Sequence, residues 1–91
     1  MVDTAGTLIE AIKALRDQGA NKIYSMATHG VLSGPALERI DKCEELESII
    51  ITDTIEHKNL PDKVIVLSVA DILSKAIHRT FNHDSVSSLF V

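Results

Sequence analysis

Residues 3–7, with the sequence DTAGT, have the composition of a loop that binds an anion at the start of a helix. The small residues Ala5 and Gly6 allow a ligand to approach the backbone closely, and the hydroxyl groups of Thr4 and Thr7 can donate hydrogen bonds. Apolar residues follow at helical spacing and predict a helix whose first N–H groups are free to bind an oxyanion. The same residues would also suit an ordinary helix N-terminus that is capped by Asp3 or Thr4 and binds nothing.

The other reactive residue types are not spaced as a catalytic or metal site. Cys43 lies among charged residues with no histidine nearby in the sequence, which argues against a nucleophile. Asp53 follows a run of β-branched residues, so we expect it at the carboxyl end of a strand, where it could line a ligand cleft. We expect His29 to make a structural hydrogen bond. Metal-ligand spacing is lacking among His57, His78 and His83, and we predict no catalytic residue and no metal site.

Composition narrows the class of protein. The chain has 91 residues, 45% of them hydrophobic and 24% charged, which is typical of a single globular domain covering residues 1–91. A net charge of −4 with no basic stripe argues against nucleic acid as a partner. No apolar run reaches the roughly 18 residues that span a bilayer, and residues 1–10 lack the features of a secretory signal. Together with a single cysteine, these features favour a cytoplasmic protein with no membrane partner.

Hydrophobic periodicity predicts three helices and three strands that would position these residues. Apolar residues at helical spacing predict helices that begin at Leu8 and end near Gly19, cover residues 36–42 with Pro35 in the first turn, and cover residues 72–81 after Asp71. Runs rich in β-branched residues predict buried strands at residues 22–28, 48–52 and 63–69.

This order of elements predicts an α/β fold with a mostly parallel sheet and helices on both faces. In such folds a phosphate-binding loop follows the carboxyl end of a strand. Only Met1 and Val2 precede the DTAGT loop (residues 3–7), so we expect the strand before it to be missing or very short.

Four segments together carry a family resemblance. They are DTAGT, THGVLSGPALERI at residues 28–40, ITDTI at residues 51–55 and SVSSLF at residues 85–90. Over its whole length, the chain resembles the C-terminal part of ribose-phosphate diphosphokinase, the phosphoribosyl diphosphate synthase. The resemblance implies a partial phosphoribosyltransferase-like (type I) domain that lacks its first strand or strands.

The resemblance also implies a binding role for named residues. Asp3, Thr4, Ala5, Gly6 and Thr7 match the segment that holds the 5-phosphate of ribose 5-phosphate, with Mg²⁺ and ATP bound alongside in the complete enzyme. Near the other end, the matching positions belong to a regulatory phosphate or ADP site, although a tail that merely docks on the sheet would look similar. These tail positions are Ser85, Ser87 and Phe90.

Several parts of the family pattern are not found in this sequence. They are an acidic pair before the DTAGT loop, the mobile loop with a catalytic lysine, and the N-terminal half that binds nucleotide. We therefore expect the chain to be the ribose 5-phosphate-binding part of a synthase, cut or separately started, and to need the missing half or other subunits and to form a homo-oligomer. The alternative is a non-catalytic phosphate-binding or oligomerisation module of the same family.

Overall fold

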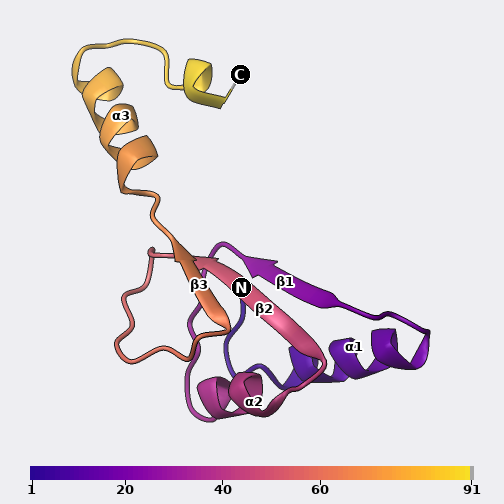
Figure 1. Cartoon of the computed structure of the whole chain (residues 1–91). Helices are drawn as coiled ribbons and strands as arrows, with labels where there is room; N and C mark the ends of the chain where they lie inside the picture. The colour runs from indigo at the N-terminus through magenta and orange to yellow at the C-terminus, as the bar shows by residue number, and fades with distance from the viewer. Residues whose placement is uncertain (91) are drawn as a thin grey trace.

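The computed structural model describes residues 1–90 as an α/β fold built on a three-stranded parallel sheet (Figure 1). The elements are, in chain order, α1 (Gly6–Asp17), β1 (Ile23–Ala27), α2 (Ala36–Lys42), β2 (Leu46–Thr52), β3 (Val64–Leu67), α3 (Ala70–Phe81) and the short 3-10 helix η1 (Ser87–Phe90). The strands lie in the order β1-β2-β3, and each neighbouring pair is parallel. The predicted α/β class and parallel sheet are confirmed.

Strand register decides which side chains share a face of the sheet. Met26 pairs with Ile50, which pairs with Ile65, so these three residues form one row on the same face. The neighbouring rows place Ile49 and Ile51 of the central strand on the opposite face, because successive strand side chains alternate.

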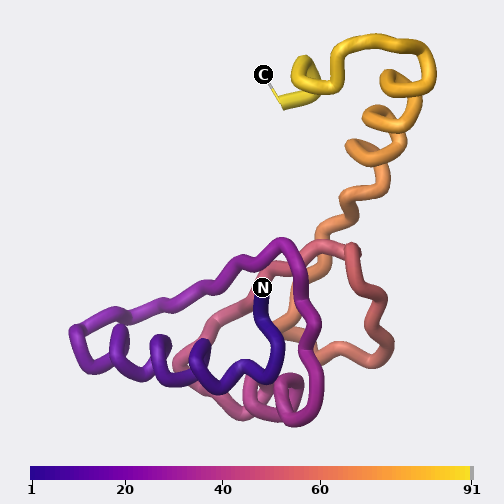
Figure 2. The backbone as a smooth tube through the Cα atoms, turned by 180° about the vertical axis from the view of Figure 1, so that it is seen from behind, coloured from indigo at the N-terminus to yellow at the C-terminus, as the bar shows by residue number. Residues whose placement is uncertain are grey.

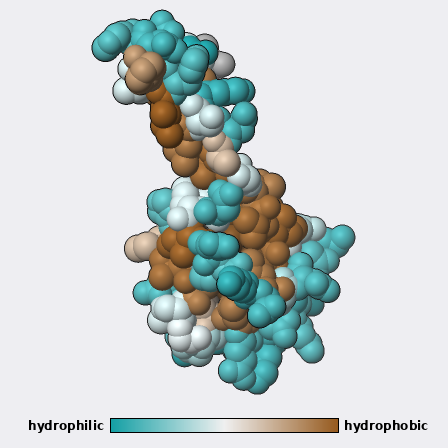
Figure 3. All heavy atoms as spheres, turned by 90° about the vertical axis from the view of Figure 1, so that its left-hand side faces the viewer, coloured by the Kyte–Doolittle hydropathy of each residue, from teal (hydrophilic) through white to brown (hydrophobic). Residues whose placement is uncertain are grey.

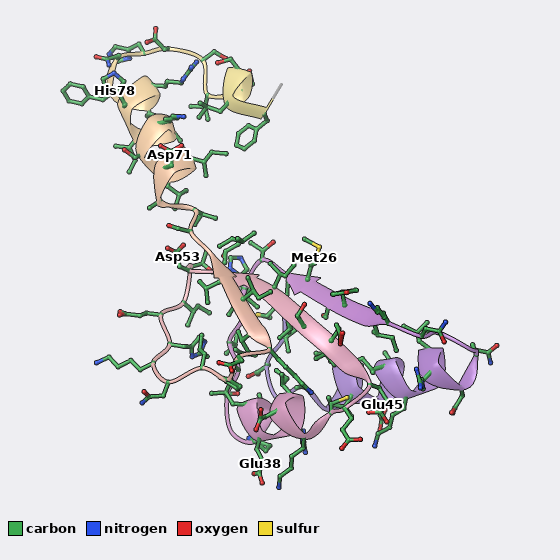
Figure 4. All side chains as sticks on the ribbon, viewed as in Figure 1. Met26, Glu38, Glu45, Asp53, Asp71 and His78 are labelled. Carbon is green, nitrogen blue, oxygen red and sulfur yellow. The ribbon has the colours of Figure 1, made fainter. Side chains whose placement is uncertain are left out.

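Both α1 and α2 lie on one face of the sheet, and the core is between them and the central strand (Figure 1). The largest fully buried side chains are Ile12, Ile40, Leu46, Ile49 and Ile51. The prediction of helices on both faces is therefore wrong for residues 1–90. On the other face Tyr24, Met26 and Leu67 remain exposed, and Met26 points away from α1 and α2 (Figure 4).

The second face is uncovered because α3 leaves the sheet as a projecting arm (Figure 2). The chain measures 51 × 28 × 19 Å along its principal axes. No residue of α3 is buried, and its apolar side chains Leu73, Ile77 and Phe81 are exposed. Figure 3 shows hydrophobic surface running along this arm and over part of the body below it.

The predicted element boundaries hold within a few residues. The second helix matches residues 36–42, whereas β2 begins two residues before Ser48, and β3 ends at Leu67. Asp71 lies inside the first turn of α3 instead of before it. The strand expected to be missing or short before the DTAGT loop is a single parallel bridge between Val2 and Gly30.

Candidate functional site

The DTAGT loop enters α1 through a left-handed residue. Ala5 is the residue before the helix, with φ 66° and ψ 4°, and no side chain caps the helix N-terminus. The alternative of an ordinary cap made by Asp3 or Thr4 is therefore wrong in this structure. Asp3 does not cap the helix because its carboxylate accepts a hydrogen bond from the Ser33 hydroxyl. The first amide N–H groups of α1 are left without a side-chain partner.

A left-handed alanine is a strained conformation. It costs on the order of 1–2 kcal/mol, because the Cβ atom crowds the backbone. Ala5 is nevertheless almost fully buried, with 4% of its surface exposed. Leu32 is also left-handed, with φ 51°, and it belongs to the segment of residues 28–40 that faces the loop. Such residues persist only where their surroundings hold them in place, and they concentrate at functional sites.

The facing segment supplies much of that support. Val2 donates its N–H to the carbonyl of His29 (3.1 Å), and its own carbonyl accepts from Val31 (2.9 Å). One step further along, the N–H of Ser33 donates to the carbonyl of Asp3 (3.0 Å). Two of the segments that carry the family resemblance, residues 3–7 and 28–40, therefore lie side by side (Figure 2).

Arg39 of α2 also contacts the loop, and the sequence analysis did not single it out. Its guanidinium donates to the carbonyl of Thr4 (3.0 Å). A Cβ atom added at Gly6 would lie 3.1 Å from the same guanidinium nitrogen. Arg39 follows the apolar residue Ala36 by three positions and so falls near its side of α2, but no local pattern in the sequence indicates a contact with Thr4, 35 positions away.

The DTAGT loop lines a hollow of about 400 Å³, together with Met1, Val2, Leu8 and Ala11. Thr4 and Thr7 are exposed there, whereas Ala5 is buried and Gly6 is half-buried. This volume falls in the range of small-molecule sites. The structure thus brings together all five predicted loop residues, two free hydroxyl-bearing side chains and a helix N-terminus, which is an arrangement suited to an oxyanion.

Comparison with known proteins gives a consistent result. The family model described as "Phosphoribosyl synthetase-associated domain" matches residues 1–91. The chain belongs to this family. The ribose-phosphate pyrophosphokinase of Caldanaerobacter subterraneus is 52% identical over 93 residues, which cover 99% of this chain and 29% of that protein. The enzyme of the same name from Thermotoga maritima is 48% identical over 90 residues and is covered to 28%.

A solved structure supports the same fold. The phosphoribosylpyrophosphate synthetase from Mycobacterium smegmatis superposes on this chain with a TM-score of 0.83 and 40% identity. The match covers 91% of this chain and 28% of that one. The predicted family and phosphoribosyltransferase-like architecture are confirmed, and the chain spans less than a third of the length of these relatives.

The structure places Asp53 away from the DTAGT loop, at the base of the α3 arm (Figure 4). Its carboxylate accepts hydrogen bonds from the Ser68 side chain and from the N–H of Val69 (2.9 Å). Both bonds favour the ionised form, so the pKa of Asp53 is lowered. Asp53 thus positions the start of α3, and it does not line the loop hollow.

The remaining singled-out residues have structural surroundings. His29 Nδ1 lies 2.8 Å from Thr54 Oγ1, which agrees with the expected structural hydrogen bond. Burial raises the pKa of the Cys43 thiol, and the nearby Glu45 carboxylate adds to this effect. A thiol with a raised pKa is a poor nucleophile at neutral pH. Among residues 1–90, no group of three or more His, Cys, Asp or Glu side chains could hold a metal ion.

The tail residues gather at the far end of α3. Ser85 and Ser87 place their hydroxyl oxygens 2.8 Å apart, and Arg79 donates to the Ser85 carbonyl (3.2 Å) and to the Ser88 hydroxyl. Arg79 was not anticipated from the sequence. Phe90 is 71% exposed. This cluster is separate from the DTAGT loop, because α3 carries it away from the sheet (Figure 1).

The structure contains no candidate membrane-spanning helix within residues 1–90, since none there is both long and apolar enough.

Proposed function

We propose that this chain is the ribose 5-phosphate-binding part of a ribose-phosphate diphosphokinase, and that it corresponds to the C-terminal part of that enzyme. The complete enzyme would transfer the diphosphoryl group of ATP to the C1 hydroxyl of ribose 5-phosphate and so make phosphoribosyl diphosphate for nucleotide synthesis. The observation that carries the proposal is the uncapped N-terminus of α1, which opens into the hollow lined by the DTAGT loop.

In this proposal the loop holds the 5-phosphate through backbone and hydroxyl groups. The N–H groups of Gly6 and Thr7 and the hydroxyls of Thr4 and Thr7 are the donors, and the positive end of the α1 dipole favours the dianion. Asp3 acts through its backbone and its bond to Ser33, because a carboxylate would repel the phosphate. Charge-assisted hydrogen bonds are each worth about 1.5–3 kcal/mol, so a few of them support an affinity on the order of millimolar to high micromolar after ordering costs.

We propose that this chain holds neither Mg²⁺ nor ATP by itself. Asp3 is the single carboxylate of the loop, and no metal-ligand cluster occurs in residues 1–90. Diphosphoryl transfer depends on positioning and on charge neutralisation by Mg²⁺ and cationic groups. We propose that other parts of the synthase supply these groups, in the cytoplasm, and that the 91-residue chain alone has no turnover.

The uncovered apolar surfaces support a second role in assembly. The sheet face around Met26 and the stripe of α3 around Ile77 are exposed within residues 1–90. Exposed apolar surface of this kind is typical of an interface. We propose that these surfaces contact the remainder of the synthase or further copies of the chain as a homo-oligomer. A non-catalytic oligomerisation or phosphate-binding module is the alternative that these observations leave open.

The test of the loop is isothermal calorimetry with ribose 5-phosphate, with ribose as the ligand control. We expect weak binding of ribose 5-phosphate, none of ribose, and none of either by Gly6→Val, because a β-branched side chain would crowd the Arg39 guanidinium and shift the loop. Equal heats from wild type and Gly6→Val would reject the loop as the site.

A coupled assay for AMP release tests the dependence on other parts of the synthase. We expect no release from the 91-residue chain with ATP and Mg²⁺, and turnover once the remaining part of a relative is added. Robust turnover by the chain alone would reject this proposal.

We also propose a regulatory anion site in the tail cluster of Ser85, Ser87 and Phe90. Arg79 adds a positive charge beside the hydroxyls of Ser85 and Ser87, which favours phosphate or ADP. Phe90 is close to these residues in sequence and could contact a base. A double Ser85→Ala, Ser87→Ala variant should weaken phosphate binding to the tail, as followed by the amide chemical-shift changes that added phosphate causes. Phosphate binding equal to that of wild type would reject the site.

A further inference from the structure

Arg39 contacts the backbone of the DTAGT loop. Its guanidinium binds the Thr4 carbonyl at 3.0 Å, yet Arg39 does not line the hollow formed by that loop. It lines a different hollow of about 350 Å³ between α1 and α2, together with Lys13 and Lys42. Arg39 therefore reaches the backbone of the loop from the hollow between α1 and α2 and not from the hollow that the loop lines.

The contact fixes the peptide unit that joins Thr4 to Ala5. In a trans peptide the carbonyl and the following N–H point in opposite directions. Holding the Thr4 carbonyl toward Arg39 thus turns the N–H of Ala5 away from the guanidinium. Ala5 is also the strained left-handed residue, so this peptide would relax to another conformation if nothing held it.

Gly6 has a matching requirement. A Cβ atom at this position would come within 3.1 Å of the Arg39 nitrogen, which is tight enough to push the guanidinium aside. The φ angle of Gly6 is not positive, so the backbone itself does not demand glycine here. A side chain at residue 6 would instead require the Arg39 guanidinium to move by a few tenths of an ångström.

We propose that Arg39 is a positioning residue, which acts through the Thr4 carbonyl to hold the DTAGT loop in its anion-binding conformation, and that Gly6 is glycine to admit it. The role in ligand binding rests on the proposed function, whereas the effect on loop conformation can be measured without ligand.

Arg16 provides a matched control. Its guanidinium makes the same kind of contact to the carbonyls of Ala20 (3.0 Å) and Asn21 (3.1 Å), at the opposite end of α1.

The first experiment compares Arg39→Gln, Arg39→Lys and Arg16→Gln. In the ligand-free chain, we expect amide shifts of residues 4–8 to change in Arg39→Gln, to return partly in Arg39→Lys, and to stay unchanged in Arg16→Gln. The dissociation constant for ribose 5-phosphate should rise about tenfold in Arg39→Gln, which is the loss expected for one hydrogen bond from a charged donor, and less than twofold in Arg16→Gln. Unchanged loop shifts in Arg39→Gln would overturn the proposal. If wild type binds no ribose 5-phosphate, the proposed function fails while the ligand-free shifts still decide the role of Arg39.

The second experiment is a double-mutant cycle, and it remains informative if Arg39→Gln loses stability. Gly6→Ala should change the loop shifts in the wild-type background, because the methyl group displaces the guanidinium. In the Arg39→Gln background the same substitution should add almost nothing, since the shorter side chain leaves the space free. Equal effects of Gly6→Ala in both backgrounds would show that the two residues are not linked, and would overturn the proposal.

Discussion

Helices α1 and α3 are both twelve residues long and both have an apolar stripe, yet only α1 is part of the core. Ile12 of α1 is 1% exposed, whereas Ile77 of α3 is 70% exposed. The difference shows what a periodic sequence does and does not specify. Helical spacing of apolar residues predicts that a helix has a face to bury, but it does not identify the surface that buries it.

The reason lies in the connections of the two helices. α1 leads into β1 through a tight turn and so folds back beneath the sheet, where Ile40 and Ile49 complete its packing (Figure 1). α3 follows β3 after only Ser68 and Val69, and it continues away from the sheet. The uncovered sheet face and the stripe of α3 are thus two apolar surfaces that do not meet within residues 1–90.

The same substitution in the two helices should have the largest difference in effect. Ile12→Ala removes a fully buried side chain and should lower the free energy of unfolding by about 2–5 kcal/mol. Ile77→Ala removes an exposed one and should change it by less than about 0.5 kcal/mol in dilute monomer. Urea unfolding followed by circular dichroism measures both. Similar losses would mean that α3 is packed in solution and that the contrast is wrong.

Gly30 tests how tightly the body of the molecule is packed. A Cβ atom there would come within 2.7 Å of the Ile51 Cδ1 atom, so Gly30→Ala should destabilise the fold by about 1–3 kcal/mol. Ile51→Val deletes that methyl group and should reduce the cost of Gly30→Ala when the two are combined. Additive losses in the double variant would show that the two residues do not compete for the same space.

Measuring self-association tests whether the exposed apolar stripe of α3 is an interface. If the stripe of α3 is an interface, the chain should self-associate at micromolar concentration or bind the remainder of the synthase. Ile77→Glu should then weaken the association about tenfold, the loss expected when one large apolar contact is removed. Ser74→Glu adds the same charge at a polar position of the helix and serves as the control. Sedimentation measures both, and a monomeric wild-type chain would contradict homo-oligomer formation.

Most elements of the fold could be predicted because they depend on local pattern. The β-branched run around Ile50 and the strong helical spacing of residues 36–42 each specify one element, and both are present in the structure. The cover of the second sheet face could not be predicted, because it depends on where α3 goes after Val69. That path depends on tertiary contacts, which periodicity does not contain.

Some residues of the candidate site could be predicted from the sequence in the same way, and others could not. The five loop residues were recognisable because small and hydroxyl-bearing residues before a helix are typical of anion loops. The left-handed conformation of Ala5 was not, since alanine has no intrinsic preference for it and the contacts around the loop come from residues distant in sequence. Arg39 contacts Thr4 across 35 positions of sequence, and a contact of that range has no local signal.

The smallest expected effect concerns the junction between the two regions, where Asp53 binds the start of α3. Hydrogen bonds from Ser68 and Val69 lower the pKa of Asp53, so folding favours the ionised carboxylate. Its contribution is complete above the ordinary pKa of an aspartate and is lost as the pH falls through the lowered value. Acidification through that range should therefore loosen the first turn of α3, as seen in the ¹³Cα shifts of residues 70–73, before the body unfolds.

Asp53→Asn should give the loosened shifts already at neutral pH, with no further change on acidification, whereas Asp62→Asn, in the exposed loop before β3, should behave as wild type. If Asp53→Asn leaves these shifts unchanged at neutral pH, the arm begins without help from the sheet edge. The boundary between the packed and the projecting region would then lie at Leu67, where β3 ends, and not at Asp53.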